Sequence, residues 1–83
     1  MNYLILKKII NENDPVGLLA MNAPEDEYDP EINNILKKLT KNYTLEDIKK
    51  IVFEEFIKWF GKNTLKNCEQ QLHRIAEDIY NQQ

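Results

Sequence analysis

The sequence has few of the residues that interrupt helices or cross-link a chain: two glycines, three prolines and one cysteine in 83 residues. One cysteine cannot form an internal disulfide, so we do not expect a secreted scaffold that depends on disulfides. No apolar run is long enough to cross a membrane. Lys7 and Lys8 interrupt the only apolar stretch near the N-terminus, so we expect no signal peptide. These absences predict a cytoplasmic protein with no membrane association.

Common catalytic and cofactor-binding strings are also missing: there is no glycine-rich phosphate loop, no cysteine pair, no HExxH and no GxSxG. Cys68 has no His or Asn close in sequence that could activate it, and we expect it to be a small buried apolar residue. The single histidine, His73, has Glu69 and Glu77 four residues away on either side, a spacing typical of a solvated helix face. We therefore predict a protein that is not an enzyme and that uses no cofactor or metal.

What the sequence does contain is helical periodicity over most of its length. Apolar residues recur at helical spacing in 3–13, 29–40, 45–60 and 64–80. Asp29 and Thr44 are expected N-caps, Pro30 fits a first helical position, and Gly61 fits a helix end. With 42% hydrophobic and 30% charged residues, the chain has the composition of one small globular domain spanning 1–83. The predicted fold class is all-α, a compact four-helix bundle-like domain.

The segment 45–60 is the most apolar of the four, with nine apolar residues in sixteen. An apolar face this wide predicts a central helix that is covered by the other three. We expect the aromatic residues of this segment to lie in the core. If they do not, they form a patch for a partner, and a homodimer is left open. The four aromatic residues are Phe53, Phe56, Trp59 and Phe60.

The connection between the first two predicted helices is unusually long, since it covers residues 14–28. Asp14-Pro15 favours a turn, and Gly17 allows a backbone conformation that other residues resist. Its apolar residues predict that it packs on the bundle as a fixed loop. Residues 12–31 carry seven Asp or Glu and no Lys or Arg, whereas the chain as a whole has a net charge of −3. The acidic charge is therefore concentrated around this loop.

Two strings in this region carry a resemblance: Asp14-Pro15-Val16-Gly17-Leu18 and Ala23-Pro24-Glu25-Asp26-Glu27-Tyr28-Asp29-Pro30-Glu31-Ile32. They are similar to the DP-x-G-[LV] … AP-x-DEYD-x-EI pattern of a family of small bacterial domains of unknown function. Trp59-Phe60-Gly61 resembles that family's pattern too. The resemblance implies an all-helical bacterial protein and brings no activity, ligand or catalytic residue. Asn22 stands where the pattern suggests Gly, and Asn tolerates a left-handed conformation next best after Gly.

The favoured function is a non-enzymatic protein-interaction module, an adaptor or an immunity-like protein, that docks a basic protein partner through the acidic loop 14–31. The alternative is a small ligand or cation bound in the crevice between this loop and the bundle. Lys58, Lys62 and Lys66 are spaced by four and could contact phosphates, but an acidic chain with a single Arg argues against nucleic-acid binding. The candidate binding residues are Asp14, Pro15, Gly17, Pro24, Glu25, Asp26, Glu27, Tyr28, Asp29 and Glu31.

Overall fold

The computed structural model describes residues 1–83, and all of its regular structure is helical. In chain order the helices are α1 (Tyr3–Asn13), α2 (Asp29–Lys38), α3 (Leu45–Phe60), α4 (Lys62–Leu65) and α5 (Glu69–Asn81). The prediction of an all-α fold is confirmed. None of these helices is both long and apolar enough to cross a membrane.

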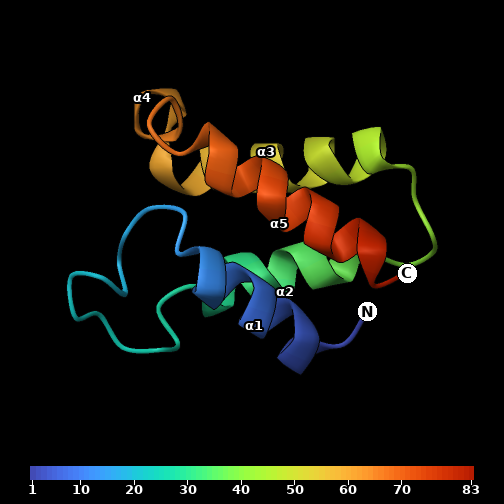
Figure 1. The fold of residues 1–83 in the computed structure, drawn as a ribbon, viewed down its shortest axis with the longest axis horizontal. Helices are drawn as coiled ribbons and strands as arrows, with labels where there is room; N and C mark the ends of the chain where they lie inside the picture. The colour runs from blue at the N-terminus through green and yellow to red at the C-terminus, as the bar shows by residue number, and fades with distance from the viewer.

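The four longer helices pack in a closed circuit, in which α1 contacts α2, α2 contacts α3, α3 contacts α5, and α5 contacts α1. The short α4 packs on α3. Residues 14–28, which we call the 14–28 segment, lie beside α4 at one end of the molecule in Figure 1. Residues 39–44, which we call the 39–44 connection, lie at the other end with both termini (Figure 1). Helix α2 therefore joins two non-helical regions at opposite ends of the fold.

Side-chain caps fix the starts of α1 and α3. Asn2 Oδ1 accepts a hydrogen bond from the N–H of Ile5 at 2.9 Å, and Thr44 Oγ1 accepts one from the N–H of Asp47 at 3.2 Å. The predicted N-cap at Thr44 is therefore confirmed. Helix α3 ends where Gly61 adopts a φ of +82°, a conformation that a residue with a Cβ resists.

The predicted fourth helix, from Thr64 to about Tyr80, is wrong at its start. The short α4 ends at Leu65, and α5 begins only at Glu69. The apolar side chains that recur at helical spacing in 64–80 are nevertheless all buried: Leu65, Cys68, Leu72, Ile75 and Ile79. A spacing of three residues places Leu65 and Cys68 on the same side of a continuous helix or across a tight turn. The local pattern therefore did not reveal the break.

The expectation that 45–60 forms a central helix is also wrong, because α3 is one wall of the circuit. It packs mainly on α2, α4 and α5, while α1 packs on α2 and α5. The aromatic residues of α3 divide accordingly. Phe56 is fully buried, Phe53 and Phe60 are half-buried, and Trp59 is 47% exposed. Part of the wide apolar face of α3 is therefore exposed to solvent.

Candidate functional site

The 14–28 segment is a series of hydrogen-bonded turns. The N–H of Gly17 donates to the carbonyl of Asp14 at 3.0 Å, and the N–H of Ala23 donates to the carbonyl of Leu18 at 3.0 Å. Gly17 has a φ of +76° and Asn22 a φ of +67°. The sequence predicted a special backbone conformation at Gly17 and tolerance of a left-handed one at Asn22, and both are confirmed.

A buried hydroxyl and a carboxylate hold the two ends of this segment together. Tyr28, which is fully buried, donates its hydroxyl hydrogen to Asp14 Oδ1 at 2.7 Å. The same hydroxyl oxygen accepts from the N–H of Val16 at 3.1 Å and of Leu18 at 3.4 Å. One tyrosine at the end of the segment therefore organises the backbone at its beginning.

The Asp14 carboxylate organises the turn that follows. Asp14 Oδ1 accepts from the N–H of Leu19 at 3.1 Å, and Oδ2 accepts from the N–H of Ala20 at 2.9 Å. Burial alone would raise the pKa of Asp14, but the hydrogen bonds from Tyr28 and from these N–H groups outweigh it and hold the pKa below its ordinary value. Burial and the bond to Asp14 raise the pKa of the Tyr28 hydroxyl. Asp14 is thus an anion and Tyr28 a neutral donor.

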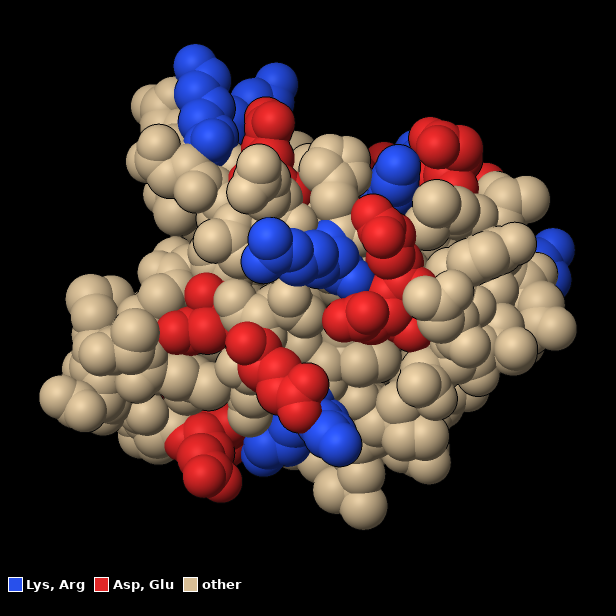
Figure 2. All heavy atoms as spheres, in the orientation of Figure 1, with Lys and Arg blue, Asp and Glu red and all other residues tan.

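Apolar contacts anchor the base of the segment and leave its tip free. Tyr28 packs edge-on against Phe56 with ring centroids 6.2 Å apart, and Val16 and Leu18 are half-buried against the core. At the tip Met21 is 68% exposed. In Figure 2 the part of the molecule that projects farthest on the left, where Figure 1 shows the segment, carries no charged side chain. The tip is therefore uncharged, and the acids lie closer to the helices.

Three consecutive acids follow the tip. Glu25, Asp26 and Glu27 are all exposed, and no Lys or Arg lies within ion-pair distance of them. Their backbone is fixed, because the N–H of Glu27 donates to the carbonyl of Pro24 at 3.1 Å and the carbonyl of Glu25 accepts from Asn11 Nδ2 at 3.0 Å. They are exposed acids without ion-pair partners on a backbone that hydrogen bonds hold in place.

One further predicted site residue, Asp29, has structural partners instead. Asp29 is not an N-cap, which corrects the prediction. Tyr28 takes the N-cap position of α2, with no side-chain hydrogen bond, and Asp29 is the first residue of the helix. Asp29 Oδ1 accepts from the Tyr3 hydroxyl at 2.8 Å and lies 3.4 Å from Lys7 Nζ. This carboxylate therefore ties α2 to α1.

Glu31 was predicted as a surface acid near the start of α2, but only 3% of it is exposed. One of its carboxylate oxygens, Oε2, is buried without a hydrogen-bond partner. Burial raises the pKa of Glu31, and the negative charge of Glu55 on α3 raises it further. Burial therefore removes Glu31 and Tyr28 from the surface that a partner can touch.

Sequence reasoning missed Glu55, which is 1% exposed on α3. Its Oε2 accepts from Asn34 Nδ2 at 3.0 Å and from Trp59 Nε1, and its Oε1 lies 3.7 Å from Lys38 Nζ. The signal was available, because Glu55 lies four residues before Trp59 and three after Val52, on the apolar side of the helix. The carboxylate links α2 to α3.

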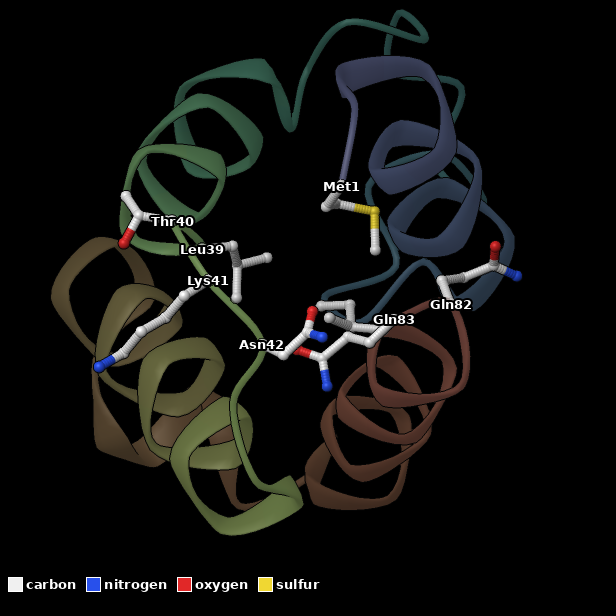
Figure 3. Close-up of a pocket in the computed structure, with 8 residues that line it drawn as sticks. Met1, Leu39, Thr40, Lys41, Asn42, Gln82 and Gln83 are labelled. Carbon is white, nitrogen blue, oxygen red and sulfur yellow. The ribbon is translucent and has the colours of Figure 1, made fainter.

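The crevice proposed between the 14–28 segment and the helices corresponds to a hollow of about 400 Å³. Among the polar candidate residues of the loop, Asp14 lines this hollow, whereas Asp26, Glu27 and Tyr28 do not. A second hollow, of about 230 Å³, lies at the far end of the molecule, where Met1, Leu39, Asn42 and Gln83 point toward one another (Figure 3). The lining of the first hollow consists of Asp14, Pro15, Val16, Gly17, Thr64, Asn67, Cys68 and Gln71.

The remaining sequence candidates have local roles. Cys68 is buried as predicted, its Sγ lies 3.7 Å from the carbonyl oxygen of Thr64, and burial raises the pKa of the thiol. His73 packs against Phe53 with ring centroids 5.1 Å apart, so it is not simply a solvated residue. Lys58 and Lys62 do not continue one helix face, because α3 ends before Lys62.

The comparisons with known proteins add no relative. No protein-family model, no curated protein and no solved structure matches the chain. Within the structure, no group of three or more His, Cys, Asp or Glu side chains is arranged to hold a metal ion.

Proposed function

We propose that the chain is a non-enzymatic protein-interaction module, a four-helix bundle-like scaffold whose long packed loop presents an acidic docking surface to a basic partner. The observation that carries the proposal is the run Glu25, Asp26 and Glu27, three exposed carboxylates without an ion-pair partner on a backbone fixed by hydrogen bonds. In the same region, Asp14 and Asp29 accept hydrogen bonds or pair with other groups of the fold. These three do neither.

The fixed backbone supports a binding role because ordering a flexible loop on association costs free energy. The hydrogen bonds among Asp14, Tyr28 and the intervening N–H groups already hold the segment in one conformation. A partner then meets acids and the exposed Met21 in preset positions. Binding at such a site does not have to order the loop backbone.

The charge distribution supports a basic partner. Residues 12–31 contain seven acids and no Lys or Arg. A concentrated charge of one sign speeds encounter with a surface of the opposite sign and disfavours acidic competitors. In an adaptor or an immunity-like inhibitor, rapid and selective capture of a basic protein is the property that such a surface supplies.

The test is affinity capture from lysate of the source cells with a Glu25/Asp26/Glu27→Lys variant. The matched control is Glu54/Glu69/Glu77→Lys, which changes the net charge equally at exposed helix positions. We expect the wild type and the control to retain one and the same protein, released by added salt, and the loop variant to lose it. Circular dichroism verifies that both variants keep their helices. Equal retention by the loop variant, or equal loss in both variants, contradicts the proposal.

The hollow beside Asp14 supports a second candidate function, binding of a small polar ligand between the 14–28 segment and α5. Its lining offers the amides of Asn67 and Gln71 and the hydroxyl of Thr64. A ligand there raises the melting temperature of the wild type, and Gln71→Leu abolishes the rise. Calorimetry with Ca²⁺, Mg²⁺ and Mn²⁺ tests a cation in the same place, and the absence of heat with all three dismisses the cation.

A further inference from the structure

We propose that a second surface, at the opposite end of α2, binds a compact anion that carries several phosphate groups. The surface is an open hollow of about 750 Å³ formed by the last turn of α2, the 39–44 connection and the first turns of α3. We call it the basic hollow. Its lining consists of Lys37, Lys38, Thr40, Lys41, Asn42, Tyr43, Thr44, Asp47, Lys50 and Ile51.

The basic hollow concentrates positive charge on a protein whose net charge is −3. Four lysines line it, against a single acid, Asp47. Lys38 lies 3.7 Å from the buried Glu55, but the other three lysines have no acid within ion-pair distance. At least three ammonium groups are therefore free to meet an anion.

Local helix stabilisation accounts for only part of this charge. Lys37 and Lys38 lie in the last turn of α2, where a positive charge favours the helix dipole. Lys41 lies in the 39–44 connection and Lys50 in the second turn of α3, so neither has such a role. In Figure 3 the Lys41 side chain points away from the hollow into which Met1, Leu39 and Gln83 point. Its Nζ lies 5.6 Å from the centre of the Tyr43 ring, which lines the basic hollow.

The basic hollow also offers uncharged donors suited to phosphate oxygens. The hydroxyls of Thr40 and Thr44 line it. Thr44 caps α3 by accepting from the N–H of Asp47, and its hydroxyl hydrogen has no acceptor in the protein. The first turn of α3 carries Glu46 and Asp47, so the lysines and not the helix N-terminus supply the positive charge of the hollow. Ammonium and hydroxyl donors together match the chemistry of a phosphate group.

The rest of the molecule favours a compact ligand over a long polyanion. Residues 12–31, with seven acids and no base, lie at the other end of α2 and repel an extended negative chain. The free lysines come from three consecutive parts of the chain, α2, the 39–44 connection and α3, and all line one hollow. A small polyphosphate can use this local charge without meeting the acidic end.

The test is isothermal titration calorimetry with inorganic triphosphate at low salt. It compares the wild type with Lys41→Gln/Lys50→Gln and with the control Lys58→Gln/Lys66→Gln, which removes the same charge from exposed lysines outside the basic hollow. We expect the wild type and the control to bind, and the hollow variant to lose about tenfold or more in affinity. All four substituted lysines are exposed, so both variants should fold. Circular dichroism verifies this.

Three results would overturn the proposal. The first is no binding of triphosphate by the folded wild type. The second is an equal loss in both variants, which would show only a dependence on total charge. The third is binding of a single-stranded oligonucleotide that is tighter than triphosphate binding and equally sensitive to Lys41→Gln/Lys50→Gln. That result would assign the basic hollow to a nucleic-acid backbone.

Discussion

The two non-helical regions that flank α2 are held in opposite ways. The 14–28 segment is fixed mainly from within, by the Tyr28 hydroxyl and the Asp14 carboxylate that it contains, with one further hydrogen bond from Asn11 of α1. The 39–44 connection is fixed from outside, by Gln83 near the C-terminus. Gln83 Nε2 donates to the carbonyl of Tyr43 at 2.8 Å, and its Oε1 accepts from the N–H of Tyr43 at 2.9 Å. One region carries acids and the other lines a hollow with lysines.

This contrast shows how a small fold can order two surfaces at different cost. A region of fifteen residues needs buried polar groups of its own, because its backbone N–H groups would otherwise lose water without gaining a partner. A connection of six residues between two helices leaves fewer such groups, and one exposed side-chain clamp is enough. The 14–28 segment should therefore be sensitive to single polar substitutions, and the 39–44 connection should not.

The largest difference in stability is expected between the removal of two tyrosine hydroxyls, one in each region. Tyr28→Phe removes a hydroxyl that donates to Asp14 and accepts from two N–H groups, which lowers the free energy of unfolding by about 2 kcal/mol. The control Tyr43→Phe removes a hydroxyl with no hydrogen bond in the structure and should change stability little. Urea unfolding followed by circular dichroism measures both. An equal loss of stability in the two variants would contradict the claim that only the 14–28 segment depends on a tyrosine hydroxyl.

The second prediction concerns the pH dependence of Asp14. Its pKa is lower in the folded protein than in the unfolded chain, so its stabilisation is fully present above the unfolded value and is lost as the pH falls through the lower folded value. Asp14→Asn should cost about 1.5 kcal/mol at pH 7, since the carboxylate is still partly open to water. The cost should shrink below about pH 4. Asp26→Asn, at an exposed acid, is the control. A cost that is constant with pH would rule out the role of the carboxylate charge.

The third prediction is a gain in stability, at the acidic end of α2. The pKa of Glu31 is higher in the folded protein than in the unfolded chain. The stabilisation that Glu31 gives in its protonated form is therefore fully present below the pKa of the unfolded chain and is lost as the pH rises through the pKa of the folded protein. At pH 7 the buried carboxylate, with its Oε2 unpartnered, is therefore unfavourable. Glu31→Gln should raise the free energy of unfolding by about 1 kcal/mol at pH 7 and change it little near pH 4. A loss of stability at pH 7 would show that the charge has a partner in solution.

The smallest effect is expected at the exposed clamp on the 39–44 connection. Gln83→Ala removes two hydrogen bonds that compete with water, and we expect a loss of about 0.5 kcal/mol. Gln82→Ala, next to it, removes no such bond. Thermal melting of the two variants gives the difference, and a loss as large as that of Tyr28→Phe would mean that both regions depend equally on one contact.

Local patterns in the sequence predicted the helices well wherever a cap or a breaker marked their ends. The start at Leu45 and the stop before Gly61 follow from the cap at Thr44 and the helix end at Gly61 that the sequence predicts and the structure keeps. The break between α4 and α5 has no such mark, because no Gly or Pro occurs near Lys66–Cys68 and both Leu65 and Cys68 are buried. Tertiary packing decides it.

The acidic residues were harder to assign, because their roles depend on residues far away in the sequence. Asp29 accepts from Tyr3, 26 positions earlier, and Glu55 accepts from Asn34, 21 positions earlier. The apolar neighbours Val52 and Trp59 at helical spacing mark Glu55 in the sequence, but no local rule distinguishes Asp29 from the exposed Glu25 or Glu27. The run 12–31 thus reads as uniformly acidic in sequence, whereas in the structure some acids hold the fold and others face outward.

The central claim is that the 14–28 segment is an ordered element that holds its exposed acids in place. Native-state amide hydrogen exchange tests it most directly, at the N–H groups of Leu19 and Ala20 that Asp14 accepts. The account predicts exchange at least about 100-fold slower than in an unstructured peptide, and a loss of this protection in Asp14→Asn while the core of α3 stays protected. Exchange in the wild type as fast as in an unstructured peptide would contradict it.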